Sequence, residues 1–234
     1  FQISNRGDIA GWYVDPSDFI RGFVRFRDGT FSQPIVDPSD TGHSTLASGI
    51  NNNRTVVGSF FVVTDNGFHG FVLSGRAFTQ FDFGSAIETD LAGINDAGDF
   101  AGYFLDNSEV VRAFVSIDGV SKRVKIPGSV SDYAVGINNA DTIVGCYEDS
   151  LSVTHGYYRN ATGNMTSVDF PGSTFTELRG INDKGWIVGR YLLDTGSYHG
   201  FVLLPPNTFL PYDYPDSTAT SLNGINNTGF ITGR

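Results

Sequence analysis

The chain has 234 residues, of which 40% are hydrophobic and 17% charged, and its formal net charge is −10. This composition is globular, and the negative charge argues against nucleic acids and anionic membrane surfaces as partners, because both attract Lys and Arg. Cys146 is the only cysteine, which excludes an intrachain disulfide and a cysteine-based zinc site, and no apolar run is long enough to predict membrane insertion.

A repeat of about 44 residues runs through the chain. Its marker is the tripeptide Gly-Ile-Asn, which begins at Gly49, Gly93, Gly136, Gly180 and Gly224, and a degenerate copy begins at Gln2. We therefore predict one domain, residues 1–234, built from repeats 2–48, 49–92, 93–135, 136–179 and 180–223, with an extra partial repeat over 224–234.

Each repeat predicts four short strands in the same order. A strand that ends in Gly-Ile-Asn is followed by a turn and a strand of the form G-x-I-V-G-x-Y, as in residues 185–191. A third strand is centred on His-Gly-Phe-Val, as at His199, and a fourth alternates apolar and polar residues, as at Phe81–Phe83. No segment has a sustained period of 3.6 residues, so almost no helix is expected.

These elements predict an all-β fold, a five-bladed β-propeller with four-stranded antiparallel blades. The two ends of the chain carry the same part of the repeat, residues 1–12 and 223–234. We expect the C-terminal stretch, residues 218–226, to supply the innermost strand of the first blade and to close the ring, which would remove an open sheet edge. The second strand is then present twice: one copy is displaced, or it pairs with another molecule, or the chain was cut from a longer array of repeats.

Most recurring residues are interpreted as structural. The Asn of Gly-Ile-Asn and the Gly that follows are typical of a hairpin turn with left-handed backbone. His69, His155 and His199 occupy equivalent positions, and Arg21 and Arg112 stand at the same place in the other repeats. A repeated hydrogen bond to the next blade is favoured there over a cationic ring or a metal site.

Positions that vary within the constant frame are better candidates for ligand binding. On the innermost strands these are the residues one and three places before the Gly of Gly-Ile-Asn, and Trp12 and Arg190 vary in the same way on the second strand. We predict a polar pocket formed by Asp90, Tyr133, Glu177 and Arg179, with surface drift as the alternative reading of this variation.

Catalytic and metal-binding motifs are not evident, so no catalytic residue and no metal ligand is assigned. Asp90, Asp132 and Glu177 lie on three inner strands, and a glycosidase would need two such carboxylates to converge. The stretches 15–18 and 37–40 read Asp-Pro-Ser-Asp, which is ordinary turn chemistry, with calcium left open as a cofactor.

The pattern G-I-N-x-x-G-x-I-V-G-x-Y followed by His-Gly-Phe resembles the repeats of bacterial extracellular HAF-repeat proteins. The resemblance covers nearly the whole chain, with Gly180 to Phe201 as the best copy, whereas Gln2, Ser4 and Arg21 depart from the motif. It implies a secreted or cell-surface protein with a propeller-like fold, and it carries no activity to transfer.

Three functions follow as hypotheses. The first is a secreted, non-catalytic binding or scaffold module with a glycan or protein ligand. The second is a hydrolase or lyase that acts on a polysaccharide at the channel mouth. The third is an assembly element that forms oligomers through the duplicated terminal strands.

Overall fold

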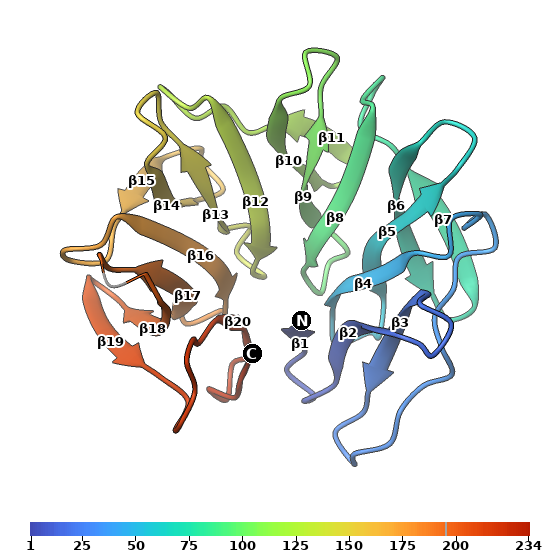
Figure 1. Ribbon diagram of the computed structural model, residues 1–234, viewed down its shortest axis with the longest axis horizontal. Helices are drawn as coiled ribbons and strands as arrows, with labels where there is room; N and C mark the ends of the chain where they lie inside the picture. Colours follow the sequence, from blue (N-terminus) through green and yellow to red (C-terminus); the bar gives the residue numbers. More distant parts are fainter. Residues whose placement is uncertain (195) are drawn as a thin grey trace.

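The computed structural model describes residues 1–194 and 196–234. These residues form 21 β-strands and no α-helix, and the strands gather into sheets arranged around a central axis (Figure 1). The predicted all-β class, the antiparallel pairing and the four-stranded unit are confirmed. No helix within these two ranges is long and apolar enough to cross a membrane.

The strands follow the repeat. The first sheet holds β1 (Gln2–Ile3), β2 (Ile9–Val14) and β3 (Ile20–Arg25). Two four-stranded sheets come next: β4 (Thr45–Ile50), β5 (Val56–Val62), β6 (Gly67–Ser74) and β7 (Ala77–Phe81), then β8 (Glu88–Ile94), β9 (Phe100–Leu105), β10 (Val111–Ile117) and β11 (Val120–Arg123).

The second half of the chain continues the pattern. The strands are β12 (Ser131–Ile137), β13 (Ile143–Glu148), β14 (Thr154–Arg159), β15 (Met165–Val168), β16 (Phe175–Ile181), β17 (Ile187–Leu192), β18 (Tyr198–Leu204) and β19 (Thr208–Tyr212). A parallel bridge between Thr154 and Phe175 links these two repeats into one eight-stranded sheet. A two-stranded sheet of β20 (Leu222–Ile225) and β21 (Ile231–Gly233) ends the chain.

The Asn of each Gly-Ile-Asn motif fixes the turn between the first two strands. The Asn51 side-chain oxygen accepts hydrogen bonds from the backbone N–H groups of Asn53 and Thr55, while its amide nitrogen donates to the carbonyl of Asn95 in the next repeat. The positive φ angles of these turns fall further along, on residues such as Arg54 and Gly98. The expected left-handed Asn is therefore wrong, and this residue acts through its side chain.

Aromatic side chains of the third strands fill the core of each unit. Phe71, Phe114, Tyr157 and Phe201 are fully buried. Each ring packs against the Gly of the neighbouring second strand, where a Cβ atom would come within 3.0 Å of the ring. Gly is required there because the ring occupies the space of a side chain, and each sheet thereby buries an apolar face against the next.

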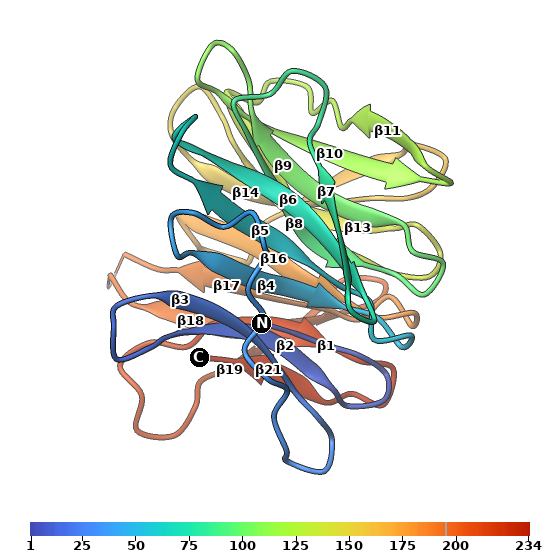
Figure 2. The ribbon, with the colours of Figure 1, turned by 90° about the vertical axis from the view of Figure 1, so that its right-hand side faces the viewer.

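Among the described residues, six strands line the axis. They contact one another in the order β1, β4, β8, β12, β16, β20 and back to β1. Their Gly residues pack in sequence, so that a Cβ on Gly224 would lie 3.0 Å from the Cα of Gln2. The two ends of the chain therefore lie close together, as Figures 1 and 2 show.

The predicted closure of five blades by the C-terminal strand is wrong. β1 itself pairs with β2, and β20 pairs with β21, since residues 222–233 carry the first hairpin of the repeat. The sheets are consequently not joined into one closed ladder of strands. The first sheet also differs from the four-stranded sheets that follow it, because Phe31 and Ile35 form isolated bridges to β3 in place of a fourth strand.

Candidate functional site

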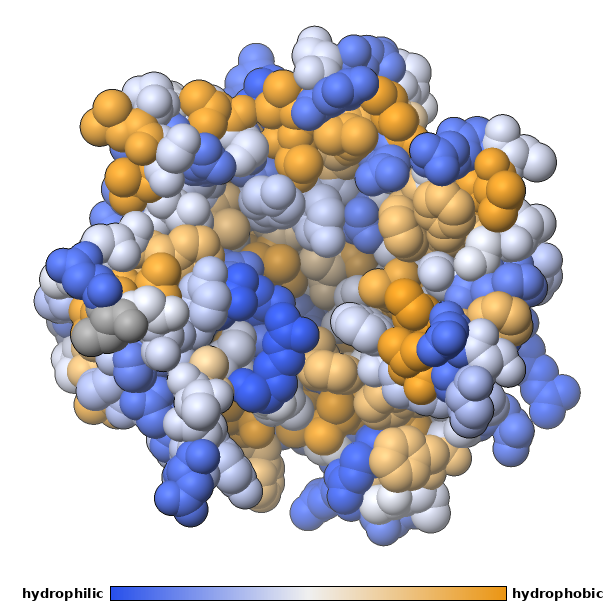
Figure 3. Space-filling model, in the orientation of Figure 1, coloured by the Kyte–Doolittle hydropathy of each residue, from blue (hydrophilic) through white to orange (hydrophobic). Residues whose placement is uncertain are grey.

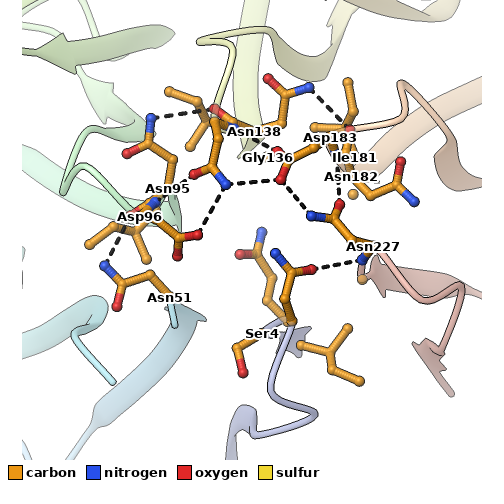
Figure 4. A pocket seen from close by; sticks show the side chains of 18 of the residues that line it. Ser4, Asn51, Asn95, Asp96, Gly136, Asn138, Ile181, Asn182, Asp183 and Asn227 are labelled. Carbon is orange, nitrogen blue, oxygen red and sulfur yellow. Dashed lines mark hydrogen bonds between the residues drawn. The ribbon is translucent and has the colours of Figure 1, made fainter. Parts of the chain in front are cut away.

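The two ends of the axis differ in width and chemistry. At one end the turns after the inner strands form a ring of amides and carboxylates around a cavity of about 60 Å³, which has room for only a few water molecules. Figure 4 shows Asp183 and Asn227 pointing toward one another at this opening, while the Asn138 side chain turns to Asn182.

The residues of this narrow end satisfy one another. Asn139 donates from its side-chain nitrogen to the carboxylates of both Asp96 and Asp183, at 3.0 and 2.9 Å. Asn52 donates to Asp96 and Asn227 to Asp183 in the same manner. Both carboxylates thus accept two amide groups each, and the ring is a device that joins neighbouring repeats.

Gln2 separates the narrow end from the rest of the axis. It occupies the position that is Gly in the other inner strands, and its side-chain nitrogen donates to the carbonyl of Val135 on β12 at 2.9 Å. β12 lies three places from β1 in the ring of inner strands, so the side chain crosses the axis. The wide end is therefore a cavity with a floor.

The wide end holds a cavity of about 380 Å³ between β9, β12, β13, β16 and β17. Its lining combines aromatic and charged side chains, namely Tyr103, Tyr133, Tyr147, Phe175, Glu148, Glu177, Arg179 and Arg190, together with Ser131, Val135, Cys146 and Thr154. Figure 3 shows the molecule hollowed near its centre, with hydrophilic residues beside the hollow.

Glu177 organises the charges of this cavity. One carboxylate oxygen accepts from Arg179 and the other from Arg190, each at 2.6 Å. Arg190 also lies over the ring of Tyr198, with its guanidinium carbon 4.3 Å from the ring centre. A carboxylate held between two guanidinium groups fixes both planar cations in place and leaves the trio with one net positive charge.

Arg179 lies two residues after Glu177 on β16, so strand alternation places both side chains on the cavity face. A β-bulge also falls at Arg179, since the ladder between β16 and β17 shifts register between Leu178 and Gly180, and the same shift precedes the Gly of β4, β8, β12 and β20. The Nε–H of Arg179 is buried and has no hydrogen-bond partner among the described residues.

Two tyrosines form the apolar wall. The rings of Tyr103 and Tyr133 meet edge to face with their centres 5.1 Å apart. Burial raises the pKa of Tyr133, with smaller contributions from Cys146 and from the carboxylates of Glu148 and Glu177, and burial likewise raises the pKa of Tyr103. Both phenols are therefore neutral hydrogen-bonding groups at physiological pH.

Asp90 lies beside this wall rather than in the charged trio. It is the cross-strand partner of Tyr103, and its carboxylate accepts a hydrogen bond from the Ser59 hydroxyl on β5. Burial raises the pKa of Asp90 to about 6, although the Ser59 hydrogen bond opposes this shift. The structure thus brings Tyr133, Glu177 and Arg179 into one cavity and places Asp90 at its side.

Sequence reasoning missed Tyr103 as a part of the wall and left Arg190 outside the predicted pocket. Both occupy the same variable position of the second strand, one residue after its Gly. Comparison of the repeats had singled out Arg190 at this position but not Tyr103. The cross-strand register makes the signal clear, since Arg190 is opposite Glu177 and Tyr103 is opposite Asp90.

Of the three carboxylates Asp90, Asp132 and Glu177, Asp132 does not converge with the other two, whereas Asp90 and Glu177 both lie near Tyr103. Asp132 is fully buried on the other face of β12, where it accepts hydrogen bonds from the Ala113 backbone and the Ser129 hydroxyl. It stands where other repeats have Thr, and it joins two neighbouring sheets.

The repeated histidines bind carboxylates of their own repeat, not of the next one. His69 contacts Asp65 and Asp82, and His155 contacts Asp149 and Asp169. Arg21 and Arg112 make the equivalent ion pairs with Asp15 and Asp106. The predicted repeated hydrogen bond exists with a local partner, and Arg112 also reaches Asp132 on β12 of the next sheet.

The two Asp-Pro-Ser-Asp stretches are turns stabilised by their own carboxylates. Asp15 accepts from the backbone of Ser17 and Phe19 and from Arg21. Asp37 accepts from the backbone of Ser39, and Asp40 accepts from Ser44 and Thr45. Within residues 1–194 and 196–234, no three His, Cys, Asp or Glu side chains gather as a metal site.

Comparison with known proteins gives a likeness of fold. No protein-family model matches the chain, and no curated protein matches it. Among solved structures, TolB from Acinetobacter baumannii matches with a TM-score of 0.67 at 13% identity over 91% of this chain, and the match spans about half of TolB, 53% of its length.

Two further structures are similar over most of the chain. AofleA from Arthrobotrys oligospora matches with a TM-score of 0.63 at 13% identity, covering 98% of this chain and 76% of AofleA. The BP39L lectin from Burkholderia pseudomallei matches with a TM-score of 0.50 at 9% identity, covering 91% of this chain and 68% of the lectin. At such identities the likeness concerns the fold, which is a β-propeller-like arrangement of antiparallel sheets.

Proposed function

We propose that this chain is a non-catalytic binding module that holds a glycan in the wide cavity at the end of its axis. The observation that carries the proposal is the lining of that cavity, where tyrosine rings stand beside an Arg–Glu–Arg trio. A sugar has an apolar C–H face and a rim of hydroxyl groups. The tyrosine wall can pack against the C–H face, and the Arg–Glu–Arg trio can form hydrogen bonds with the hydroxyl groups.

The charges of the trio suit a polar ligand. Arg179 and Arg190 are already held by Glu177, so their orientation does not have to be acquired on binding. The buried Nε–H of Arg179 is an unused donor, which a ligand oxygen would satisfy. One of the structurally similar proteins is described as a lectin, which supports a glycan ligand for this arrangement of sheets.

The carboxylates support binding rather than hydrolysis. Glu177 is occupied by two arginines, and Asp132 faces away from the cavity. Glycoside hydrolysis uses a pair of carboxyl groups that flank the scissile bond. A protein ligand that inserts polar side chains into the same cavity is the alternative occupant.

The test is a glycan-array screen followed by calorimetric titration of the best glycan. Tyr133→Leu removes an aromatic face from the cavity, and we expect it to weaken binding at least about tenfold, because stacking and burial of one ring contribute on the order of 1.5 kcal/mol. Tyr13→Leu is the matched control, since Tyr13 is an exposed tyrosine of the first sheet, outside this cavity.

An equal loss of glycan affinity in Tyr133→Leu and Tyr13→Leu would contradict a site at the wide cavity. A negative glycan screen together with a protein captured by the parent chain and released by Tyr133→Leu would favour the protein ligand instead.

We also propose that the chain belongs with the bacterial extracellular HAF-repeat proteins and works as a secreted or cell-surface module. The support is the G-I-N-x-x-G-x-I-V-G-x-Y pattern, which recurs in register with the strands. Fractionation of the source cells with an antibody against this chain tests the location, and a cytoplasmic signal would overturn it.

A further inference from the structure

The charges at the arginine end of the wide cavity do not balance. Arg179 and Arg190 each donate to a different oxygen of Glu177, so two guanidinium groups share one carboxylate. The three side chains are largely buried, with exposed fractions of 23% for Arg179, 20% for Arg190 and 11% for Glu177. Within the described residues, one positive charge of this wall thus has no carboxylate of its own, and a buried charge is costly until an opposite charge pairs with it.

Both guanidinium groups also keep hydrogen-bond donors that are not used. The buried Nε–H of Arg179 has no acceptor among the described residues. Arg190 donates from its Nε to Glu177, and its two terminal nitrogens have no partner within residues 1–194 and 196–234. Its guanidinium carbon lies 4.3 Å from the centre of the Tyr198 ring and 5.5 Å from that of Phe175. The two rings restrict the cation, so its free N–H groups have a preset orientation.

The other acidic residue of the lining lies on a different strand. Glu148 ends β13 and is the cross-strand partner of Ser131 on β12. Over the part of the chain that the structure describes, it forms no ion pair with Arg179 or Arg190. The cavity therefore orients a ligand with a single negative charge, because that charge is attracted to the arginines and repelled by Glu148.

We infer that the glycan of this cavity is acidic, with a sugar residue whose carboxylate pairs with Arg179 and Arg190. The inference rests on the proposed glycan site and names its ligand class. A carboxylate is planar and accepts two hydrogen bonds from one guanidinium, and the same two side chains already hold the carboxylate of Glu177. It also neutralises the trio, whereas a neutral sugar would cover an uncompensated charge. This pairing must outweigh the net charge of −10, which repels anions at long range.

The test is an array of uronate-bearing glycans, each printed beside its carboxyl-reduced form, in which the carboxylate has become a neutral hydroxymethyl group. Calorimetric titration of the parent chain with each bound pair follows. We expect reduction to weaken binding at least about tenfold, because a charge-assisted pair is stronger than a neutral hydrogen bond. Equal binding of both forms would overturn this inference and leave the glycan site standing. Binding to neither form of any glycan would overturn both.

Two variants place the preference within the cavity, measured as the ratio of the affinities for the acidic and the reduced form. Arg190→Gln should lower this ratio at least about tenfold. Arg76→Gln is the matched control, since it changes the net charge equally on the exposed turn between β6 and β7. Glu148→Gln should raise the ratio about threefold, because it removes a repelling charge.

A ratio that falls equally in Arg190→Gln and Arg76→Gln would assign the preference to net charge and overturn the pairing in the cavity. A ratio that stays at the parent value in both Arg190→Gln and Glu148→Gln would overturn it as well.

Discussion

Single side chains do much of the work of joining one repeat to the next. Asn138 shows this: its oxygen accepts from the backbone of Ala140 and Thr142 within its own turn, while its nitrogen donates to the carbonyl of Asn182 in the following repeat. Since the amide is buried, each of these bonds also satisfies a group that would be costly to leave unpaired. The regular spacing of the motif within the chain thus encodes contacts between repeats as well as a turn.

The repeated His–Asp contacts predict a pH-dependent stability. Burial opposes the charge on His69, but the carboxylates of Asp82 and Asp65 outweigh it and raise the pKa, and Asp169 and Asp149 raise that of His155. A pKa that is higher in the folded than in the unfolded state stabilises fully below the unfolded value of about 6.5. This stabilisation is lost as the pH rises through the folded-state pKa.

The double variant His69→Gln/His155→Gln should therefore lose more Tm relative to the parent at pH 5.5 than at pH 9. Thermal unfolding followed by circular dichroism measures the difference. His43→Gln is the control, because His43 stacks on Phe19 in a loop. A loss of equal size at both pH values would assign the effect to packing rather than charge.

At the scale of the strand, alternation positions the site. Glu177 and Arg179 lie two residues apart on β16, and side chains alternate with a period of two, so both face the cavity. The ladder between β16 and β17 shifts register between Leu178 and Gly180, so the bulge falls at Arg179 and changes the pairing of the residues that follow. The cavity face of the inner strand thus carries two variable positions.

The close approach of β12 and β13 makes a second prediction. A Cβ on Gly145 would overlap the carbonyl oxygen of Tyr133 and also press on the Tyr157 ring. Gly145→Ala should lower the free energy of unfolding by about 3 kcal/mol and weaken ligand binding through displaced Tyr133. Denaturant unfolding and titration of the same variant measure both effects.

Gly128→Asn is the control for that change. Gly128 has a positive φ of 80° and open space around its Cβ position, and Asn tolerates this backbone. The free energy of unfolding of this variant should stay within about 1 kcal/mol of that of the parent chain. If Gly145→Ala were equally mild, the packing of these two strands would be looser than the contacts indicate.

At the scale of the molecule, the first and last repeats meet without a shared strand ladder. The Asn226 side-chain amide donates to the Ser4 carbonyl at 3.2 Å, and the Asn227 backbone N–H donates to the Asn5 side chain at 2.7 Å. Gly224 packs on the backbone of Gln2. These are the same contacts that join repeats elsewhere, repeated across the two ends of the chain. The inner ring is thus completed by turns and glycines.

This junction gives the third prediction. Asn226→Ala and Asn138→Ala remove the same side chain at the junction and in the middle of the ring, and each should cost about 1–3 kcal/mol. Only Asn226→Ala should speed hydrogen exchange in β1 and β20, measured by mass spectrometry. Equal exchange in both variants would mean that the ends are held by other contacts.

The sequence by itself determined the all-β class, the four-strand repeat and the set of variable inner-strand positions. The reason is that turn residues and alternation are local and recur five times, so that each copy supports the others. Tyr133, Glu177 and Arg179 could be picked out as candidates because they vary where the frame is constant.

Only the tertiary structure decided how the repeats meet. The pairing of β20 with β21, the crossing of Gln2 to β12 and the burial of Asp132 between sheets all depend on contacts between residues far apart in the chain. Local patterns do not carry such contacts: Asp132 and Tyr133 are sequence neighbours, yet one joins two sheets and the other lines the cavity. The number of strands around the axis and the membership of the site follow from that packing.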